Sequence, residues 1–329
     1  MERRPRLGPL RAAWYGEASP CTGRNPFPPR VESLLLSRFK LRKTAIVVLI
    51  LLVAGAYGTL AFMMSPKPDL PELIAVDGQP SGYATVTMIH DMMQHQLDDF
   101  GGWLPNDLPL SPGWFLDNKP NFQLGVLQVV RHASRVLRDN LTRQRTSDAV
   151  HKEADLAYTA YANDPHRWAF PSAEGAFSRG DAALERFRAD LGGKANFYPR
   201  ADNLIQLIDP LISELGAVTT LLLKSRTAPD EVGWFQIDNN FYYAQGVGWA
   251  MLGLMRAVRY DFRGVLQDKN AQEITDQIIQ SLEETQFEPW VVTNGRKDGV
   301  LANHSNNLKV FLDDARQKLN SLASILRQG

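Results

Sequence analysis

Carboxylates, amides and aromatic rings gather in two segments of this 329-residue chain, 196–203 (NFYPRADN) and 234–249 (WFQIDNNFYYAQGVGW). Side chains of these types can line a pocket for a polar ligand, such as a glycan or a peptide. An enzyme acting on such a ligand would use their acidic and tyrosine side chains for proton transfer. The candidate ligand-binding residues are Tyr198, Arg200, Asp202 and Asn203 in the first segment, and Asp238, Asn239, Asn240, Tyr242 and Gln245 in the second.

The same residues also have a purely structural interpretation. Polar side chains in a nearly buried helix are costly unless they find hydrogen-bond partners. The first segment can supply those partners through Arg200, Asp202 and Asn203, while Asp238 can cap the N-terminus of a helix. Both interpretations require the two segments to lie together in the folded protein.

The spacing of the histidines does not favour a metal site. His90 and His95 are five residues apart, which places their side chains about 140° apart around a helix, whereas helical metal ligands are usually three or four apart. His132, His166 and His304 are isolated in the sequence. Phosphate-binding loops, dinucleotide fingerprints and zinc-protease motifs are absent from the sequence. We therefore expect no metal and no cofactor, and no catalytic residue is identified.

The net charge of zero, from 36 basic and 36 acidic residues, hides a separation along the chain. Residues 1–44 hold ten basic and three acidic residues, a balance of +7, and the remainder carries −7. Between these blocks, residues 45–64 contain neither a charge nor a proline. Twenty helical residues reach about 30 Å, the thickness of the hydrocarbon core of a bilayer. The neutral total also argues against a nucleic-acid partner.

This pattern predicts a single membrane-spanning helix with a cytoplasmic N-terminus and an external body. Both the apolar stretch and the 44-residue leader before it are longer than the corresponding parts of a cleaved signal peptide. The body lacks cysteine, which suits an oxidising compartment such as a bacterial periplasm. The lipid bilayer is the first expected partner. Its anionic headgroups are expected to contact four basic residues, with a favourable free energy of about 1 kcal/mol each: Arg38, Lys40, Arg42 and Lys43.

The sequence predicts a disordered leader over residues 1–44, before the membrane span. After the span it predicts an extended linker over 65–80 that lifts the body off the membrane, and then an all-α domain over 81–329. Pro210 predicts a break or a kink in one helix, and Asn294-Gly295 predicts a turn of a small hairpin within 290–301. Four prolines exclude a helix from 101–120, although its Trp, Phe and Leu residues indicate packing. Apolar residues recur at helical spacing in 83–100, 121–145, 148–161, 172–191, 202–224, 234–262, 270–285 and 305–326.

Three motifs, FYPRADNLIQLI (197–208), DNNFYYAQGVGWAML (238–252) and GGWLPND (101–107), resemble a family of uncharacterised bacterial inner-membrane proteins, domain of unknown function 2333. The resemblance covers about residues 40–329. It implies a bacterial membrane setting and a helical body, and it supplies no activity and no catalytic residues.

The sequence thus predicts a membrane-anchored helical protein of the bacterial cell envelope. The first hypothesis is a scaffold or binding module whose partner is another envelope protein or a polar ligand. The alternative is an envelope enzyme that acts on a glycan or peptide through segments 196–203 and 238–245.

Overall fold

The computed structural model describes residues 29–73, 78–145, 147–227, 233–295 and 300–328, with the side chains of 29–41, 225–227 and 234–235 left aside. These residues form helices and connecting loops without a named strand, so the all-α prediction is confirmed. The elements are α1 (Pro29–Met64), α2 (Tyr83–Asp98), η1 (Gly113–Phe115), α3 (Asn118–Val136), the π-helical turn η2 (Leu137–Leu141), α4 (Lys152–Tyr161), α5 (Ala173–Asp190), α6 (Ala201–Thr227), α7 (Trp234–Asp261), α8 (Arg263–Asp268), α9 (Gln272–Glu283) and α10 (His304–Arg327).

Helix α1 contains an apolar window, Arg42–Met64, of 23 residues with mean hydropathy 2.5, none of it buried. At about 1.5 Å per residue the window is roughly 35 Å long, enough to cross a bilayer. This exposed apolar helix suggests a membrane anchor. A second apolar stretch, Ala201–Lys224 of α6, is half buried among the other helices and belongs to their core.

The N-terminal leader differs from its prediction over residues 29–44. These residues are helical rather than disordered, because α1 begins at Pro29, a residue favoured in the first helical position. Of the four cations expected to contact lipid, Arg42 and Lys43 are exposed on this helix, whereas the side chains of Arg38 and Lys40 lie outside the described ones. Residues 1–28 also lie outside the described part of the chain.

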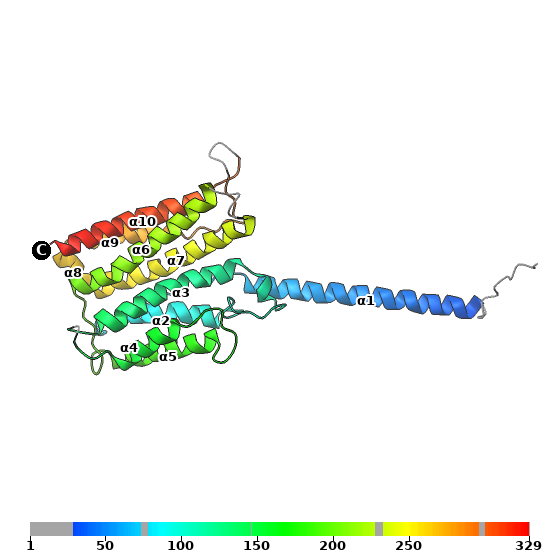
Figure 1. The fold of residues 1–329 in the computed structure, drawn as a ribbon, viewed down its shortest axis with the longest axis horizontal. Helices are drawn as coiled ribbons and strands as arrows, with labels where there is room; N and C mark the ends of the chain where they lie inside the picture. The colour runs from blue at the N-terminus through cyan, green and yellow to red at the C-terminus, as the bar shows by residue number, and fades with distance from the viewer. Residues whose placement is uncertain (1–28, 74–77, 146, 228–232, 296–299, 329) are drawn as a thin grey trace, which may run out of the picture. The chain divides into compact units, whose positions relative to one another are not determined.

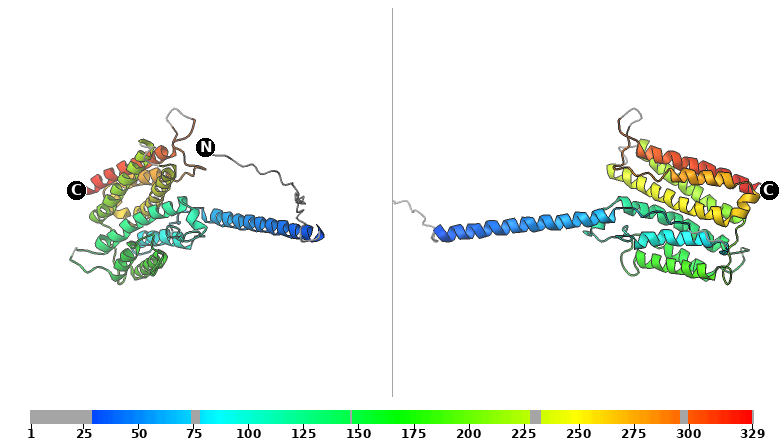
Figure 2. Two further views of the ribbon diagram at one scale, coloured as in Figure 1. Left: turned by 45° about the vertical axis from the view of Figure 1, so that its right-hand side comes forward. Right: turned by 180° about the vertical axis from the view of Figure 1, so that it is seen from behind.

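Residues Met1–Ala56 and Tyr57–Gly329 form separate compact units, and the second contains the helical body. Helices α3 and α7 lie at the centre of this body, with α9 and α10 on one flank and α4 and α5 on the other (Figures 1 and 2). The two central helices approach closely at glycines. A Cβ atom on Gly246 of α7 would lie 2.1 Å from the carbonyl oxygen of Phe122, and one on Gly125 of α3 would lie 2.2 Å from that of Tyr243. Glycine is therefore required at both positions.

The segment predicted as a spacer is extended but does not stand free of the body. Over its described part it packs against the bundle, with Pro71 buried and Leu70 and Leu73 against the hydrophobic core. The backbone carbonyl of Asp69 accepts a hydrogen bond of 3.2 Å from Nδ1 of His95 in α2. Three apolar side chains in so short a stretch gain more from burial than from exposure to water.

Two other local predictions need correction. Helix α6 continues through Pro210 as one helix, so the predicted break is wrong, while the alternative of a kink stays a prediction. The bundle packing on both sides outweighs the loss of one backbone hydrogen bond. The predicted hairpin exists as one antiparallel bridge between Asn294 and Asn303. Gly295 donates a backbone hydrogen bond of 3.1 Å to Ala302, so it belongs to an arm of the hairpin and not to its turn.

The proline-rich loop between α2 and α3 is packed at one end only. Trp103 and Leu104 are buried, and Trp103 donates a hydrogen bond of 2.9 Å from Nε1 to the carbonyl of Pro165. Trp114 and Phe115, which were also expected to pack, are exposed. The loop is therefore anchored by its first aromatic residue and presents the later ones outward.

Candidate functional site

The two segments predicted to share a site lie at different ends of the bundle. The ring of Phe197 contacts that of Phe262, with centroids 5.7 Å apart, so segment 196–203 lies beside the C-terminal end of α7. Segment 238–245 lies near the N-terminal end of the same helix. Seventeen helical residues separate Gln245 from Phe262, a distance of about 25 Å along the axis. The structure does not support an enzyme that uses both segments together.

In the first segment, one residue has a clear structural role. Asn203 is buried and donates a hydrogen bond of 2.8 Å from Nδ2 to the carbonyl of Tyr198, which holds the chain at the entry to α6. Arg200 and Asp202 are exposed and do not reach the second segment. Tyr198 is half-buried, and its backbone N–H donates to the carbonyl of Leu141 at 2.8 Å.

In the second segment, Asp238 is not the helix cap, because α7 begins at Trp234 with Gly233 as the capping residue. Burial and the nearby charge of Asp117 raise the pKa of Asp238. Asn239 and Asn240 are half-buried beside it. Among the described residues, Asp238, Asn239 and Asn240 share no pocket with the first segment.

Gln245 and Tyr242 instead hold Lys67 of the segment that follows α1. The fully buried Gln245 donates from Nε2 to the carbonyl of Phe287 at 2.7 Å and accepts from Nζ of Lys67 at 2.6 Å. Lys67 also pairs with Glu288 at 3.0 Å and lies 5.5 Å from the ring centre of Tyr242. Desolvation lowers the pKa of Lys67 despite this pairing. These contacts attach the segment that follows α1 to the helical body.

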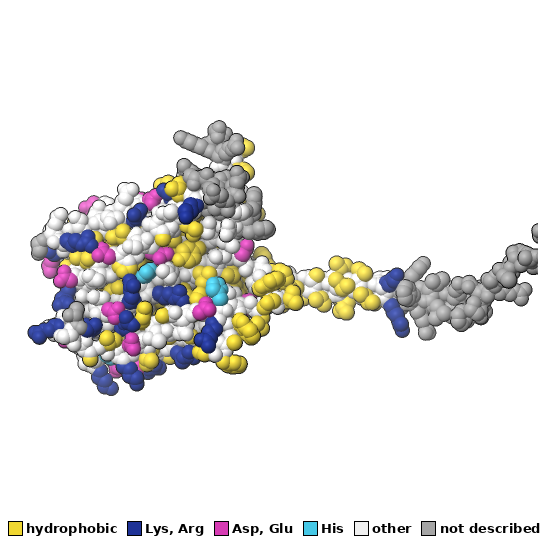
Figure 3. All heavy atoms as spheres, in the orientation of Figure 1, with side chains coloured by type: hydrophobic (Ala, Val, Ile, Leu, Met, Phe, Trp, Pro, Cys, Tyr) yellow, Lys and Arg dark blue, Asp and Glu magenta, His cyan; other side chains and the backbone are white. Residues whose placement is uncertain are grey.

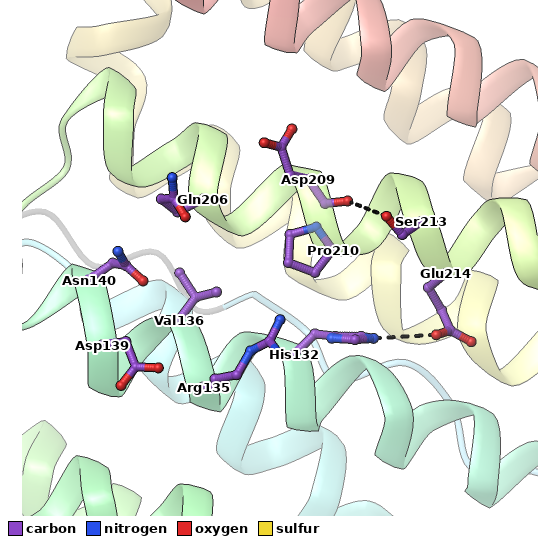
Figure 4. A pocket seen from close by; sticks show the side chains of 10 residues that line it. All are labelled: His132, Arg135, Val136, Asp139, Asn140, Gln206, Asp209, Pro210, Ser213 and Glu214. Carbon is purple, nitrogen blue, oxygen red and sulfur yellow. Dashed lines mark hydrogen bonds and ion pairs between the residues drawn. The ribbon is translucent and has the colours of Figure 1, made fainter.

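A different site lies in a polar groove between α3 and α6, with a volume of about 610 Å³ (Figure 4). Two irregularities border it: the π-helical turn η2 that ends α3, and Pro210 inside α6. Single π turns often occur at functional sites, and Pro210 leaves the carbonyl of Gln206 without its helical donor. The groove is lined by His132, Arg135, Val136, Asp139, Asn140, Gln206, Asp209, Pro210, Ser213 and Glu214.

A buried hydrogen-bond network forms one end of this groove. Glu214 accepts from Nε2 of His132 at 3.3 Å, from Gln128 at 3.2 Å and from the hydroxyl of Tyr243 at 3.0 Å. Burial alone would raise the pKa of Glu214, but these three donors outweigh it and the pKa is lowered. Burial and the Glu214 charge raise the pKa of Tyr243, so its hydroxyl remains a donor. The network therefore holds an ionised carboxylate between three helices.

The other acids of the groove are also paired, whereas one cation is not. Asp139 accepts two hydrogen bonds from Arg138, at 2.7 and 3.0 Å, and Asp209 accepts two from Arg327, at 2.8 and 2.9 Å. Arg135 is exposed and forms no ion pair within the part of the chain that the structure describes. A groove of this kind can bind a polar ligand that carries a carboxylate, through the Arg135 guanidinium and the amides of Asn140 and Gln206.

The remaining histidines do not join this site. His166 contacts the carbonyl of Pro105, His304 accepts from the backbone of Thr293, and His90 pairs with its neighbour Asp91. Over the described ranges, no three His, Cys, Asp or Glu side chains gather in a way that could hold a metal ion.

Sequence reasoning missed this groove because its two sides are distant in the chain. His132 is isolated in the sequence, because its hydrogen-bond partner Glu214 lies 82 residues further along the chain. One signal was available, since Glu214 is a charged residue that directly precedes Leu215 in the apolar repeat of α6. A carboxylate on or beside a buried face requires partners.

Comparison with known proteins identifies a family but no activity. No curated protein and no solved structure matches the chain. One family model matches residues 40–230 and 224–329, which together include the apolar helix end, the groove and the whole helical body. The chain therefore belongs to the family described as an uncharacterized protein conserved in bacteria (DUF2333).

Proposed function

We propose that this protein is a single-pass inner-membrane protein whose helical body lies in the periplasm and acts as a binding module or scaffold of the cell envelope. The charge step across the apolar window of α1 supports this orientation, with Arg42 and Lys43 on the cytoplasmic side. The absence of cysteine from the chain after residue 64 suits an oxidising compartment.

The observation that carries the binding role is the groove between α3 and α6. Its carboxylates are already paired with His132, Arg138 and Arg327, so among the residues that the structure describes a ligand meets the unpaired Arg135 and several hydrogen-bonding groups. These groups suit a polar peptide segment with an acidic side chain or a C-terminal carboxylate. A partner protein of the envelope that presents such a segment is the ligand we expect.

Site-specific crosslinking in cells tests this role. A photoreactive amino acid at Gln206, in the groove, should give a discrete crosslinked product that weakens when Arg135→Ala is added. The same probe at Leu156, which is exposed on α4, provides the matched control. Products that are equal at both positions, or no product at Gln206, would refute the proposed binding module.

Topology needs a separate measurement. A phosphatase reporter fused after Gly329 should be active, because the enzyme folds only in the periplasm. An inactive reporter, together with an active cytoplasmic reporter at the same position, would reverse the proposed orientation.

A further inference from the structure

Among the side chains that the structure describes after α1, the exposed aromatic ones are confined to three loops. These loops are 99–117 between α2 and α3, 162–172 between α4 and α5, and the described residues 284–295 after α9. Among the described residues after α1, every exposed Phe and Trp lies in one of them. Phe170 and Trp290 are 99% and 104% exposed, so neither gains any shelter from the fold. The six residues are Phe100, Trp114, Phe115, Trp168, Phe170 and Trp290.

The three loops meet at one end of the body. The first two are joined by the hydrogen bond from Asn106 Nδ2 to the carbonyl of Arg167, at 3.0 Å, and by the Trp103 bond described above. The third approaches the first around a small pocket lined by Leu116, Lys119 and Glu288. Hydrophobic side chains gather at this end in the space-filling view (Figure 3).

The last two turns of α1, which belong to the same compact unit as the body, lie against the first loop. A Cβ atom on Gly101 would lie 3.0 Å from the Met64 side chain, so the loop begins beside the last residue of α1. Its other end reaches back to Tyr57, whose ring contacts that of Phe115 with centroids 6.1 Å apart. Seven residues, or about 10 Å of helix, separate Tyr57 from Met64. Phe115 is therefore level with residues inside the apolar window.

From this geometry we infer that the three loops form a second membrane contact, inserted into the bilayer surface around α1. The inference rests on the proposed membrane anchoring of α1. Amphipathic segments bury their apolar side chains about 5–10 Å into the boundary between headgroups and acyl chains. Phe115 contacts Tyr57, which lies about 10 Å of helix from the end of the apolar window, so its place on the chain suits such a depth. Trp and Phe are suited to this boundary, and Trp is enriched there in membrane proteins. The body is thereby held against the membrane by its end.

The bilayer fits this surface better than a protein partner does, because the first loop contacts Tyr57 and Met64, which lie in the apolar window and in the same compact unit as the body. Tyr57 and Phe115 form one patch that a membrane-spanning α1 would carry into lipid. The exposed apolar residues on the sides of the bundle, Val150, Leu156, Leu223 and Val310, lie outside the three loops and offer control positions.

Fluorescent probes on the full-length chain in vesicles of phosphatidylethanolamine and phosphatidylglycerol test the inference. In a Cys21→Ser background, single cysteines replace Phe115, Phe170 or Trp290 and carry an environment-sensitive dye. Leu156→Cys and Val310→Cys are the matched controls, and Leu52→Cys reports the insertion of α1. We expect the loop probes to be quenched by lipids spin-labelled near the headgroup, Leu52 by lipids labelled deeper in the chain, and the controls by neither.

Loop probes that are quenched no more than the controls, while Leu52 is quenched, would overturn the membrane contact and leave the anchor intact. An unquenched Leu52 probe would overturn the anchor itself. Loop probes that are shielded from an aqueous quencher but not reached by lipid quenchers would show a protein occupant instead, and would also refute the inference. The triple variant Phe115→Ser, Phe170→Ser, Trp290→Ser changes only exposed side chains, and in it a dye on Trp168→Cys should lose its quenching by headgroup-labelled lipids.

Discussion

A buried carboxyl group in the flank of the body makes stability depend on pH in an unusual direction. Asp181 of α5 is 8% exposed and accepts a hydrogen bond from the hydroxyl of Tyr161 in α4. Burial raises the pKa of Asp181 to about 7, while the hydrogen bond from Tyr161 and the proximity of His90 lower it, and Asp98 and Asp91 raise it slightly. The folded protein therefore keeps this carboxyl protonated under conditions in which the unfolded chain has lost the proton.

The magnitude follows from the two pKa values. The folded value of about 7 and the reference value of 3.8 differ by about three units, or about 4 kcal/mol at 1.36 kcal/mol per unit. Between these values the folded state binds more protons than the unfolded state, so the free energy of unfolding falls as pH rises. The contribution of a protonated Asp181 is complete below pH 4 and is lost as pH rises through 7.

Asp181→Asn removes this dependence while its amide oxygen can still accept from Tyr161. We expect the variant to gain stability over the wild type as pH rises from 5 to 8, by about 3 kcal/mol for the two units between pH 5 and the folded pKa. The gain should level off above pH 8. The free energy of unfolding is measured by urea denaturation of the full chain in detergent at each pH, with tryptophan fluorescence as the signal.

The control for this measurement is Asp202→Asn, which removes an exposed carboxylate at the start of α6. Its difference from the wild type should stay constant from pH 5 to 8. Parallel pH profiles of Asp181→Asn and the wild type would refute the reasoning, because they would mean that burial does not hold the proton on Asp181.

Three further predictions follow from packing and pairing. Glu214→Gln should lower the free energy of unfolding at pH 7 by about 1–3 kcal/mol, and by less near pH 3. The pKa of Glu214 is lowered in the folded state, so the stability that its carboxylate contributes is lost as pH falls. A loss that is the same at both pH values would contradict this reasoning. Gly246→Ala should cost about 1–3 kcal/mol or more in thermal unfolding, since its Cβ would meet backbone, whereas Gly264→Ala, in open space, should be tolerated. Lys67→Met should increase proteolytic cleavage within 65–80, because the hydrogen bond to Gln245 and the ion pair to Glu288 are lost; unchanged cleavage would show that Leu70 and Leu73 hold the segment alone.

Much of the secondary structure could be predicted because helical periodicity is a local property. The apolar repeat of 305–326 corresponds to α10, His304–Arg327, within one residue at each end. The end of the apolar stretch at Met64 likewise coincides with the end of α1. Hydrophobic spacing and charge steps act within a few turns, so neither needs the tertiary fold to be recognised.

The short helix α8 was not predicted, and the sequence left open whether α6 breaks or only kinks at Pro210, since tertiary packing overrides local preference there. Asp238 is polar and precedes a buried stretch, which resembles a helix cap in sequence. The helix starts four residues earlier, at Trp234, as the apolar spacing of 234–262 predicts, so only the capping role of Asp238 is wrong.

The sequence by itself determined the helices, the apolar segment of α1 and the charge separation around it, because each depends on neighbouring residues. Only the tertiary structure decided which polar groups meet. The antiparallel course of α6 and α7 sends the two polar segments to different ends, and it brings Glu214 to His132 across 82 residues. It also places Phe115 of the loop between α2 and α3 beside Tyr57, and Gly101 of the same loop beside Met64. Side-chain chemistry is local, whereas the proximity that makes a site comes from the path of the whole chain.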